Sequence, residues 1–371
     1  MVLSQICTYA NDKISIVDVN KNTYISTENM LPNKAGIIQA ASLPSTMQVK
    51  CYKQGDVLVS NIRPYFKKIW FAEHEGSCSN DVLVFRAKET VNPYYLFYVL
   101  SCDKFFEYAM ATSKGTKMPR GDKKTLMEYE IPEHNYVEQV KIAGLLRCID
   151  DRIALNNKIN NNLLQQAEAV FSKHYDTSTD RQPFTSLISV LGGGTPKTEN
   201  PDFWDGSIPF FTPKDVGSPY TFQTEKYITE LGLEHCNSRL YPKNTSFVTA
   251  RGTVGKVSLA GKPMAMNQSC YALVSDKIDP VLVYFYVLKA VASLKHKASG
   301  AVFDAIVTRD FDTEVINILT AENSQVVLSA VSPIMNAIHN NVEENIRLSA
   351  LRDALLPKLM SGEIDVSNIE I

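Results

Sequence analysis

The sequence predicts an α+β protein in which two similar globular domains are separated by two long antiparallel coiled-coil helices, related by a pseudo-twofold internal repeat. Three observations predict this fold class: a repeat with a period near 185 residues, two matching heptad patterns, and strand pairs followed by a capped helix start in each half. The chain has 371 residues, 44% of them hydrophobic, which is enough to bury more than one core and excludes wholesale disorder.

The repeat divides the chain into four parts. Residues 176–180 contain no apolar side chain to bury and form the expected joint between the halves. We expect the first domain over residues 1–136, the first spacer helix and its joint over 137–182, the second domain over 183–320, and the second spacer helix with a C-terminal tail over 321–371.

A pattern of strand, basic turn and second strand occurs in both domains. It begins at residues 52–60 in the first domain and at residues 241–249 in the second. Basic residues occupy matching places in the two turns, Arg63 with Arg251 and Lys68 with Lys256. Their occurrence in both halves suggests that each pair has the same role in both domains.

A shorter helix follows the strands in each domain. Asn92-Pro93 begins the first of these helices and Asp279-Pro280 begins the second. Asn or Asp as N-cap, followed by Pro at the first helical position, is a usual helix start.

The two long helices are predicted by seam residues that alternate at steps of four and three, which is a heptad pattern. Each helix could pack on its own domain, but two equivalent stripes complement one another best as an antiparallel coiled coil with the domains at opposite ends. This stripe, named the helix seam, comprises Ile142, Leu146, Ile149, Ile153, Asn156, Asn160 and Leu163 in the first helix and Val327, Val331, Ile334, Ile338, Asn341, Asn345 and Leu348 in the second.

Four of the seam residues are Asn, which is unexpected in an apolar interface because an unpaired amide there costs about 1–3 kcal/mol. They occupy positions 156, 160, 341 and 345. Either they form hydrogen bonds with one another across the seam and fix its register, or they lie at its margin and contact water.

Charge and composition leave the function open. The chain carries 38 Lys and Arg against 40 Asp and Glu, and the C-terminal part over 321–371 holds 7 of the acidic residues and 3 of the basic ones. The seven cysteines have no C-x-x-C pair and are expected to be free thiols. The sequence contains no apolar run long enough to span a membrane, and we expect a cytoplasmic protein.

The sequence offers no catalytic or metal-binding signature. Residues 191–198 superficially resemble a phosphate-binding loop, but Leu191 and Pro196 occupy the positions that must be Gly. The six His residues show no metal-ligand spacing and no triad pattern. We therefore expect no catalytic residue, no metal and no cofactor in this chain.

Basic and polar residues concentrate in loops that also hold Gly and aromatic residues. Lys and Arg can neutralise phosphates, and Arg or Thr can contact base edges, although ordinary solvated surface has the same composition. The candidate DNA-binding residues are Arg63, Tyr65, Lys67, Lys68, Lys114, Thr116, Lys117 and Arg120 in the first domain, and Lys197, Thr198, Lys214, Arg251, Thr253, Lys256, Lys295, His296 and Lys297 in the second.

Several motifs together resemble the specificity subunit of type I restriction-modification enzymes. The resemblance covers nearly the whole chain, including its repeat, but the first domain lacks the Gly-Gly-Thr-Pro opening and the Arg-Gly-x-x-Gly turn. The motifs are residues 193–198 and 203–216, which are typical of the start of a target recognition domain, the turn at 251–256, Asn267-Gln268, and the ending at 351–364.

The resemblance implies a non-catalytic subunit that reads double-stranded DNA. Each of its two target recognition domains would read one half of a bipartite site, and the helix pair would fix the spacer and dock partners. The implied partners are two methylation subunits, which would bind S-adenosylmethionine, and restriction or translocase subunits. The alternative is a coiled-coil scaffold that binds other proteins and never contacts DNA.

Overall fold

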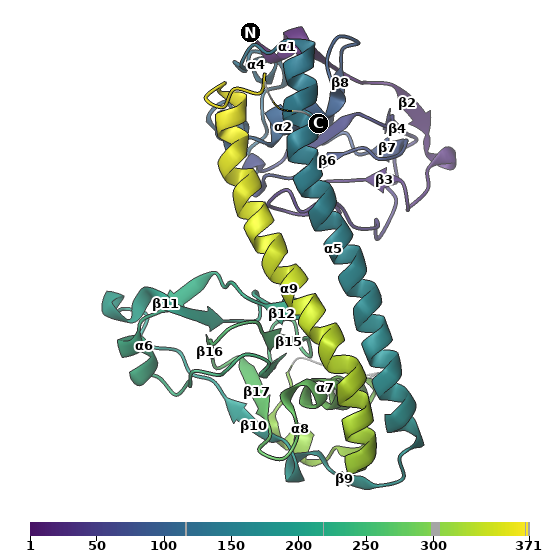
Figure 1. Cartoon of the computed structure of the whole chain (residues 1–371). Helices are drawn as coiled ribbons and strands as arrows, with labels where there is room; N and C mark the ends of the chain where they lie inside the picture. The colour runs from purple at the N-terminus through teal and green to yellow at the C-terminus, as the bar shows by residue number, and fades with distance from the viewer. Residues whose placement is uncertain (116, 218, 298–304, 368, 370–371) are drawn as a thin grey trace. The chain divides into compact units, whose positions relative to one another are not determined.

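The computed structural model describes residues 1–115, 117–217, 219–297, 305–367 and 369 (Figure 1). The chain forms two compact units: unit one comprises Met1–Ile153 and Leu348–Ile371, and unit two comprises Ala154–Arg347. Each unit therefore contains one globular domain and a segment of both long helices. The boundary between the units falls inside the helices and not at the ends of the domains.

Unit one is built on an antiparallel sheet whose strands are covered on both faces. Alternate side chains of a strand point to opposite faces, so Val57 and Val59 pack in one core while Leu58 packs in a second core. The order across the sheet is β1 (Cys7–Tyr9), β8 (Val82–Ala87), β5 (Val57–Ser60) and β6 (Ile69–Phe71).

A second sheet and four short helices complete the globular part of unit one. The side-chain oxygen of Asn92 accepts hydrogen bonds from the N–H groups of Tyr94 and Tyr95 (2.9 and 3.1 Å), so the helix start expected from the sequence is confirmed. The order in the second sheet is β2 (Lys13–Ser15), β4 (Gln48–Tyr52), β7 (Gly76–Cys78) and β3 (Tyr24–Ile25). The helices are α1 (Leu3–Ile6), α2 (Pro93–Ser101), α3 (Asp103–Ala111) and α4 (Lys123–Leu126), with 3-10 turns η1 (Ile16–Asp18) and η2 (Pro64–Phe66).

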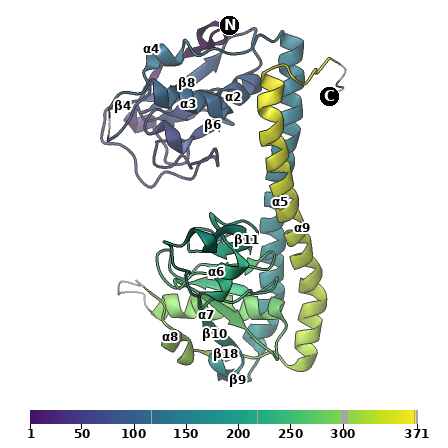
Figure 2. The same ribbon diagram turned by 90° about the vertical axis from the view of Figure 1, so that its left-hand side faces the viewer.

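Unit two has the same plan with one more strand in its main sheet. That sheet has the order β10 (Ser189–Gly192), β17 (Cys270–Val274), β14 (Ser246–Thr249), β15 (Val257–Ala260) and β12 (Tyr220–Thr221). The smaller sheets are β13 (Lys226–Ile228), β11 (Trp204–Phe211) and β16 (Ala265–Met266), and β18 (Val315–Asn317) with β9 (Arg181–Pro183). The helical segments, several of them labelled in Figure 2, are α6 (Glu230–Glu234), α7 (Pro280–Lys297), α8 (Thr308–Asp312), η3 (Phe184–Ser186) and η4 (Pro201–Phe203).

The strand pairing confirms that the two globular domains are repeats of one fold. Strand β5 lies between β8 and β6, and β14 lies between β17 and β15. Val57 pairs with Phe85 in unit one as Ser246 pairs with Leu273 in unit two. Strands β1, β8, β5 and β6 therefore correspond in order to β10, β17, β14 and β15, to which unit two adds β12.

The two long helices are α5 (Tyr136–Thr177) and α9 (Ala321–Met360), drawn in teal and yellow in Figure 1. In unit one, Arg352 of α9 donates a hydrogen bond to Asp150 of α5 (2.8 Å). In unit two, Asn341 of α9 donates to Asn160 of α5 (2.8 Å). Within unit two, Asn156 of α5 also donates to Asn345 of α9, so residue numbers fall along α9 as they rise along α5 and these segments are antiparallel.

The seam does not serve the helix pair alone. Ile142 and Leu146 of α5 share a buried core with Leu359 of α9 and the strands of unit one. Val331 of α9 shares a core with Phe171 of α5 and the sheet of unit two. The helices therefore pack both against each other and against the globular domains, because each apolar stripe is wide enough to contact a helix and a domain together.

Every helix in the described part of the chain is too short or too polar to cross a bilayer. All seven cysteines are free thiols, as the sequence predicts. Burial raises the pKa of Cys7, Cys78 and Cys270 to about 12, so these three stay protonated near neutral pH.

Candidate nucleic-acid interface

The turn between β5 and β6 in unit one contains two residues in the left-handed region. Arg63 and Lys67 have φ angles of 51° and 50°, and they flank the 3-10 turn η2. A side chain in that region costs roughly 1–2 kcal/mol. Hydrogen bonds hold the turn in place: the N–H of Arg63 donates to the carbonyl of Pro119 (2.8 Å), and the N–H of Lys34 donates to the carbonyl of Lys67 (2.9 Å).

Two aromatic rings stand at the tip of this turn. Tyr65 and Phe66 are 48% and 37% exposed, and their ring centroids are 4.6 Å apart. The Lys68 ammonium lies 5.7 Å from the Phe66 centroid and donates to the carbonyl of Thr27 (2.6 Å). Partial burial lowers the pKa of Lys68, although the Glu28 carboxylate opposes this shift. The predicted residues Arg63, Tyr65, Lys67 and Lys68 thus form one loop.

A second predicted loop lies beside the first. Ile62 and Arg120 form an isolated β-bridge, and so do Lys114 and Arg120, which places these residues next to the turn. Lys117 is exposed on this loop, whereas the predicted residue Thr116 lies outside the described residues.

Two cations of the second loop are held by carboxylates of the same unit. Lys114 lies 2.5 Å from a carboxylate oxygen of Asp122, and Arg120 lies 3.2 Å from one of Asp81. The hydrogen bond from Lys114, with a further one from the N–H of Thr125, lowers the pKa of Asp122 to about 2. Lys114 and Arg120 therefore fix the loop in addition to any role toward a ligand.

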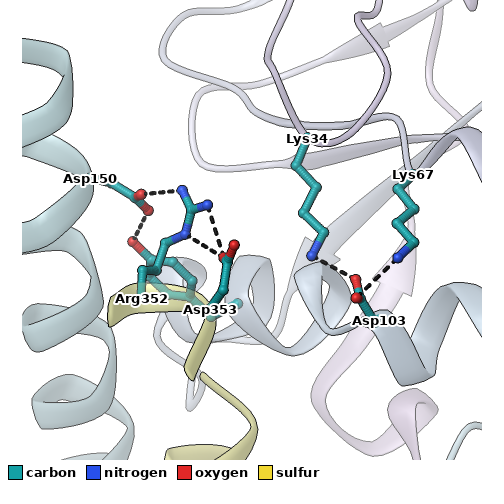
Figure 3. Close-up of polar contacts among 7 residues, drawn as sticks. Lys34, Lys67, Asp103, Asp150, Arg352 and Asp353 are labelled. Carbon is teal, nitrogen blue, oxygen red and sulfur yellow. Dashed lines mark hydrogen bonds and ion pairs between the residues drawn. The ribbon is translucent and has the colours of Figure 1, made fainter. Parts of the chain in front are cut away.

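Asp103 joins the turn to helix α3, as Figure 3 shows. Its carboxylate lies 2.8 Å from the Lys34 ammonium and 3.0 Å from that of Lys67. Burial alone would raise the pKa of Asp103, but hydrogen bonds from the two lysines hold it below its ordinary value. Lys34 was not predicted from the sequence, because it is 69 positions from Asp103 and no local pattern marks it.

The equivalent turn in unit two is built on glycine. Gly252 and Gly255 have φ angles of 80° and 71°, in the region that Gly enters without steric cost. The Thr253 hydroxyl donates to the carbonyl of Pro213 (3.2 Å), and the Thr249 hydroxyl donates to the carbonyl of Thr253. Arg251, Thr253 and Lys256 are all exposed on this turn.

Two further loops of unit two carry predicted residues. Lys197 and Thr198 are exposed on the loop after β10, where the Lys197 carbonyl accepts a hydrogen bond from the Trp204 indole (3.2 Å). Lys214, on the segment that contacts Thr253 through Pro213, lies 3.4 Å from the Glu225 carboxylate.

The last turn of α7 supplies the remaining cations predicted in unit two. Lys295 packs against Gly255, so it lies beside the turn. Lys297 instead forms an ion pair with the buried carboxylate of Glu314. His296 is exposed on the same helical turn. The contacts place Lys295 beside the predicted loop cluster and give Lys297 a partner within the fold.

The hydrogen-bond register corrects the expected equivalence of Arg63 and Arg251. The N–H of Asn61 donates to the carbonyl of Asp81, and that of Ala250 donates to the carbonyl of Ser269, each over 2.8 Å. Asn61 therefore matches Ala250, so Arg251 matches Ile62 and Gly252 matches Arg63. Lys68 and Lys256 also match, because their carbonyls accept hydrogen bonds from the N–H groups of Ser60 and Thr249, each over 3.0 Å. The unit-one turn therefore has one more residue between these matched positions than the unit-two turn.

The Asn residues of the seam form hydrogen bonds across it. Asn156 donates to Asn345 over 2.9 Å, and Asn341 donates to Asn160 over 2.8 Å. Ile142, Leu146, Ile149, Asn156, Asn160, Val327, Val331 and Ile338 are buried, while Ile153, Leu163, Ile334, Asn341, Asn345 and Leu348 are half-buried. Of the two alternatives for these amides, the structure has the hydrogen-bonded one.

The described loops of both units combine exposed cations with polar side chains, an arrangement that can hold a ligand. Within the described ranges, no group of three or more His, Cys, Asp or Glu side chains could hold a metal ion. The exposed cations Lys117, Lys197, Arg251 and Lys256 lie on loops carried by rigid sheets, where they can contact an extended anion.

The chain combines two long helices with two repeated domains, each of which carries a basic turn after an equivalent strand of its main sheet. These features define a class of duplicated, two-domain proteins. The chain belongs to the family described as type I restriction modification DNA specificity domain, which matches residues 3–165 and again residues 184–348. The double match agrees with the structural repeat.

Named relatives and a solved structure agree with this family. The type I restriction enzyme HindI specificity subunit of Haemophilus influenzae is 24% identical over a 438-residue alignment that covers 92% of this chain and 94% of that protein. The MjaIX specificity subunit of Methanocaldococcus jannaschii is 28% identical over 172 residues, 45% of this chain and 40% of that protein. The crystal structure of the type I restriction-modification S subunit from M. genitalium shares the fold, with a TM-score of 0.61, 13% identity, and 97% and 95% of the two chains covered.

Proposed function

We propose that this chain is the DNA sequence-specificity subunit of a type I restriction-modification enzyme. Each globular domain reads one half of a bipartite site in double-stranded DNA, and the helix pair sets the unread spacer between the halves. The observation that carries the proposal is the pair of turns at one register in the two domains, with exposed cations on the unit-two turn (Arg251 and Lys256) and on the loop beside the unit-one turn (Lys117). A ligand with two separated polyanionic features of similar shape matches a duplicated binding surface.

The ion pairs divide the predicted cations into two groups. Lys117, Lys197, Arg251 and Lys256 are exposed and are the first candidates for phosphate contacts. Lys67, Lys114, Arg120, Lys214 and Lys297 each neutralise a carboxylate of this chain, so each would exchange that partner for a phosphate or serve to hold its loop.

The chain itself is non-catalytic in this proposal and has no cofactor of its own. Two methylation subunits, which bind S-adenosylmethionine, dock on the helix pair, and restriction or translocase subunits complete the enzyme. Leu155 and Ile159 support the docking, because they are exposed one helical turn apart on α5. Apolar side chains of this kind are commonly covered by a partner.

The test is to produce the chain with its methylation subunits and to sequence the methylated bases of the host DNA. We expect one bipartite sequence, bound in gel shifts with an affinity whose logarithm falls linearly with the logarithm of salt concentration. Lys256→Ala should weaken binding to all sequences and reduce the salt slope by about one. Lys277→Ala is the matched control, because Lys277 precedes α7 while the turn lies at the opposite end of that helix.

Three results would contradict the proposal. Methyl transfer by the purified chain alone would show that it is an enzyme. An assembled complex that binds no DNA would favour the scaffold alternative, and one that binds all DNA sequences equally would show that the chain does not read sequence.

A further inference from the structure

We propose that unit one opens a base-pair step in its half-site with the rings of Tyr65 and Phe66, whereas unit two reads its half-site on stacked duplex. The inference rests on the proposed function, because it requires DNA as the ligand. It adds a mode of recognition, by deformation of the duplex, that differs between the two repeats.

The first observation is where the exposed aromatic side chains lie. Of the Phe, Tyr and Trp residues that the structure describes, three are exposed: Tyr65, Phe66 and Tyr136. Two of the three are neighbours at the tip of one turn, 4.6 Å apart. Large aromatic rings usually stabilise a fold by being buried, so a pair left in water at a loop tip indicates a surface that a ligand covers.

The second observation is that the rings are held on a rigid support. The carbonyls of Phe66 and Lys67 accept hydrogen bonds from the N–H groups of Asn33 (2.8 Å) and Lys34 (2.9 Å). The side chain of Lys67 is fixed by Asp103 (3.0 Å), as Figure 3 shows, and Pro64 is buried. The backbone of the turn is therefore ordered before binding, which lowers the cost of inserting the two rings as a wedge between stacked bases.

The third observation is the chemistry around the rings. Lys68 lies 5.7 Å from the Phe66 centroid, and Lys117 is exposed on the adjacent loop. Met118 on that loop is 45% exposed, which extends the apolar tip. An apolar tip among cations complements a polyanion that has flat apolar faces inside it. Nucleic-acid-binding proteins use such side chains to separate stacked bases and kink the duplex.

Unit two lacks this device at the same place. Its turn carries Gly252 and Gly255 where unit one has Arg63 and Lys67, and Thr253 and Val254 between them. It contains no ring, and Val254 is half-buried. Among the residues that the structure describes, the aromatic wedge is therefore found at the turn of unit one and not at the equivalent turn of unit two.

The test uses the complete methylation complex and a duplex that contains its methylated sequence. 2-Aminopurine is placed in turn at positions along both half-sites, because its fluorescence rises when it is unstacked. We expect a rise at one step of one half-site in the wild type, and loss of that rise in the double variant Tyr65→Ala/Phe66→Ala. The double variant should also bind about tenfold more weakly or worse, with an unchanged salt slope, since no phosphate contact is removed.

Two controls sharpen the test. Tyr136→Ala removes the third exposed ring of the same unit and should change neither signal. Extrusion of the methylated base by the partner methyltransferase should persist in the double variant, because another protein produces it. A duplex with a mismatch at the opened step should recover most of the affinity of the double variant, because the unstacking cost has already been met.

The possible failures are distinguishable. A wild-type complex that does not bind its methylated sequence specifically would overturn the proposed function and the wedge together. Specific binding without unstacking in the unit-one half-site, or equal binding by the double variant, would overturn the wedge alone. A folded double variant that no longer assembles with the methylation subunits would also overturn it, because the rings would then be a protein contact.

Discussion

The turns at 61–67 and 250–255 are the most instructive comparison in the molecule. The first joins β5 to β6 and the second joins the equivalent strands β14 and β15. Both have left-handed residues at the same two structural positions, Arg63 with Lys67 and Gly252 with Gly255. The backbone path is therefore retained while the side chains at the tip differ. A sheet that fixes the path allows the tip to change, which is how one scaffold can present two different binding surfaces.

The two turns are also stabilised differently. Glycine relieves the left-handed positions of unit two, and a threonine hydroxyl ties its turn to Pro213. Unit one keeps side chains at those positions and holds its turn through Asp103, which contacts Lys34 and Lys67. Local strain in unit one is thus offset by contacts from residues far away in the chain.

The largest effect is expected where the two units are most alike, in the helix seam. Leu146 and Val331 are 185 positions apart and both are fully buried. Leu146→Ala should lower the free energy of unfolding by about 2–5 kcal/mol, and Val331→Ala by about 1.5–3 kcal/mol because it removes fewer carbons. Denaturant titration of both variants measures this, and values below about 0.5 kcal/mol would show that the seam does not stabilise the fold.

A second comparison concerns the amides of the seam. Asn160→Ala should lower the free energy of unfolding by about 1–3 kcal/mol, because the amide of Asn341 loses its partner. The adjacent Asn161 is exposed, and Asn161→Ala is the matched control with little expected change. A double-mutant cycle with Asn341→Ala measures the coupling, and a coupling of zero would mean that water satisfies both amides equally well.

The turns themselves predict substitutions of opposite sign. Arg63→Gly should raise the free energy of unfolding by about 0.5–1 kcal/mol, since relief of the left-handed strain exceeds the entropy that Gly adds to the unfolded chain. Gly252→Ala should lower it by about 1 kcal/mol. The new methyl would meet the Pro213 side chain at an ordinary 3.7 Å, so the effect comes from the backbone angle. Thermal or chemical denaturation of both variants decides it, and equal signs would contradict the comparison.

The smallest effect is a pH dependence located in unit one. A 2.8 Å hydrogen bond joins Nδ1 of His134 to the Tyr95 hydroxyl. Burial lowers the pKa of His134 below its ordinary value of 6.5. The unfolded chain then binds a proton first as the pH falls below about 6.5, so stability declines from there down to the pKa of the folded state. His134→Gln should flatten this slope in unfolding curves taken at several pH values, and an unchanged slope would place its origin elsewhere.

The helix starts and the stripe of each long helix could be predicted because each is recorded in residues close together in the chain, and the repeat could be predicted because the same pattern recurs about 185 positions later. The equivalence of Arg63 and Arg251 was wrong because one additional residue in the unit-one turn shifts the alignment, and only hydrogen bonds such as that of Ala250 reveal it. The ion pairs of Lys114 and Lys67 were not predictable either. They depend on how loops fold back on the domain, which no periodicity encodes.

In the proposed function, the two domains read two halves of one DNA site independently. This independence is tested most directly by replacing residues 183–320 with the matching domain of a relative that methylates a different sequence, and sequencing the bases methylated by the assembled complex. We expect one half of the bipartite sequence to change while the other half and the spacer length stay the same. A change in both halves, or in neither, would contradict it.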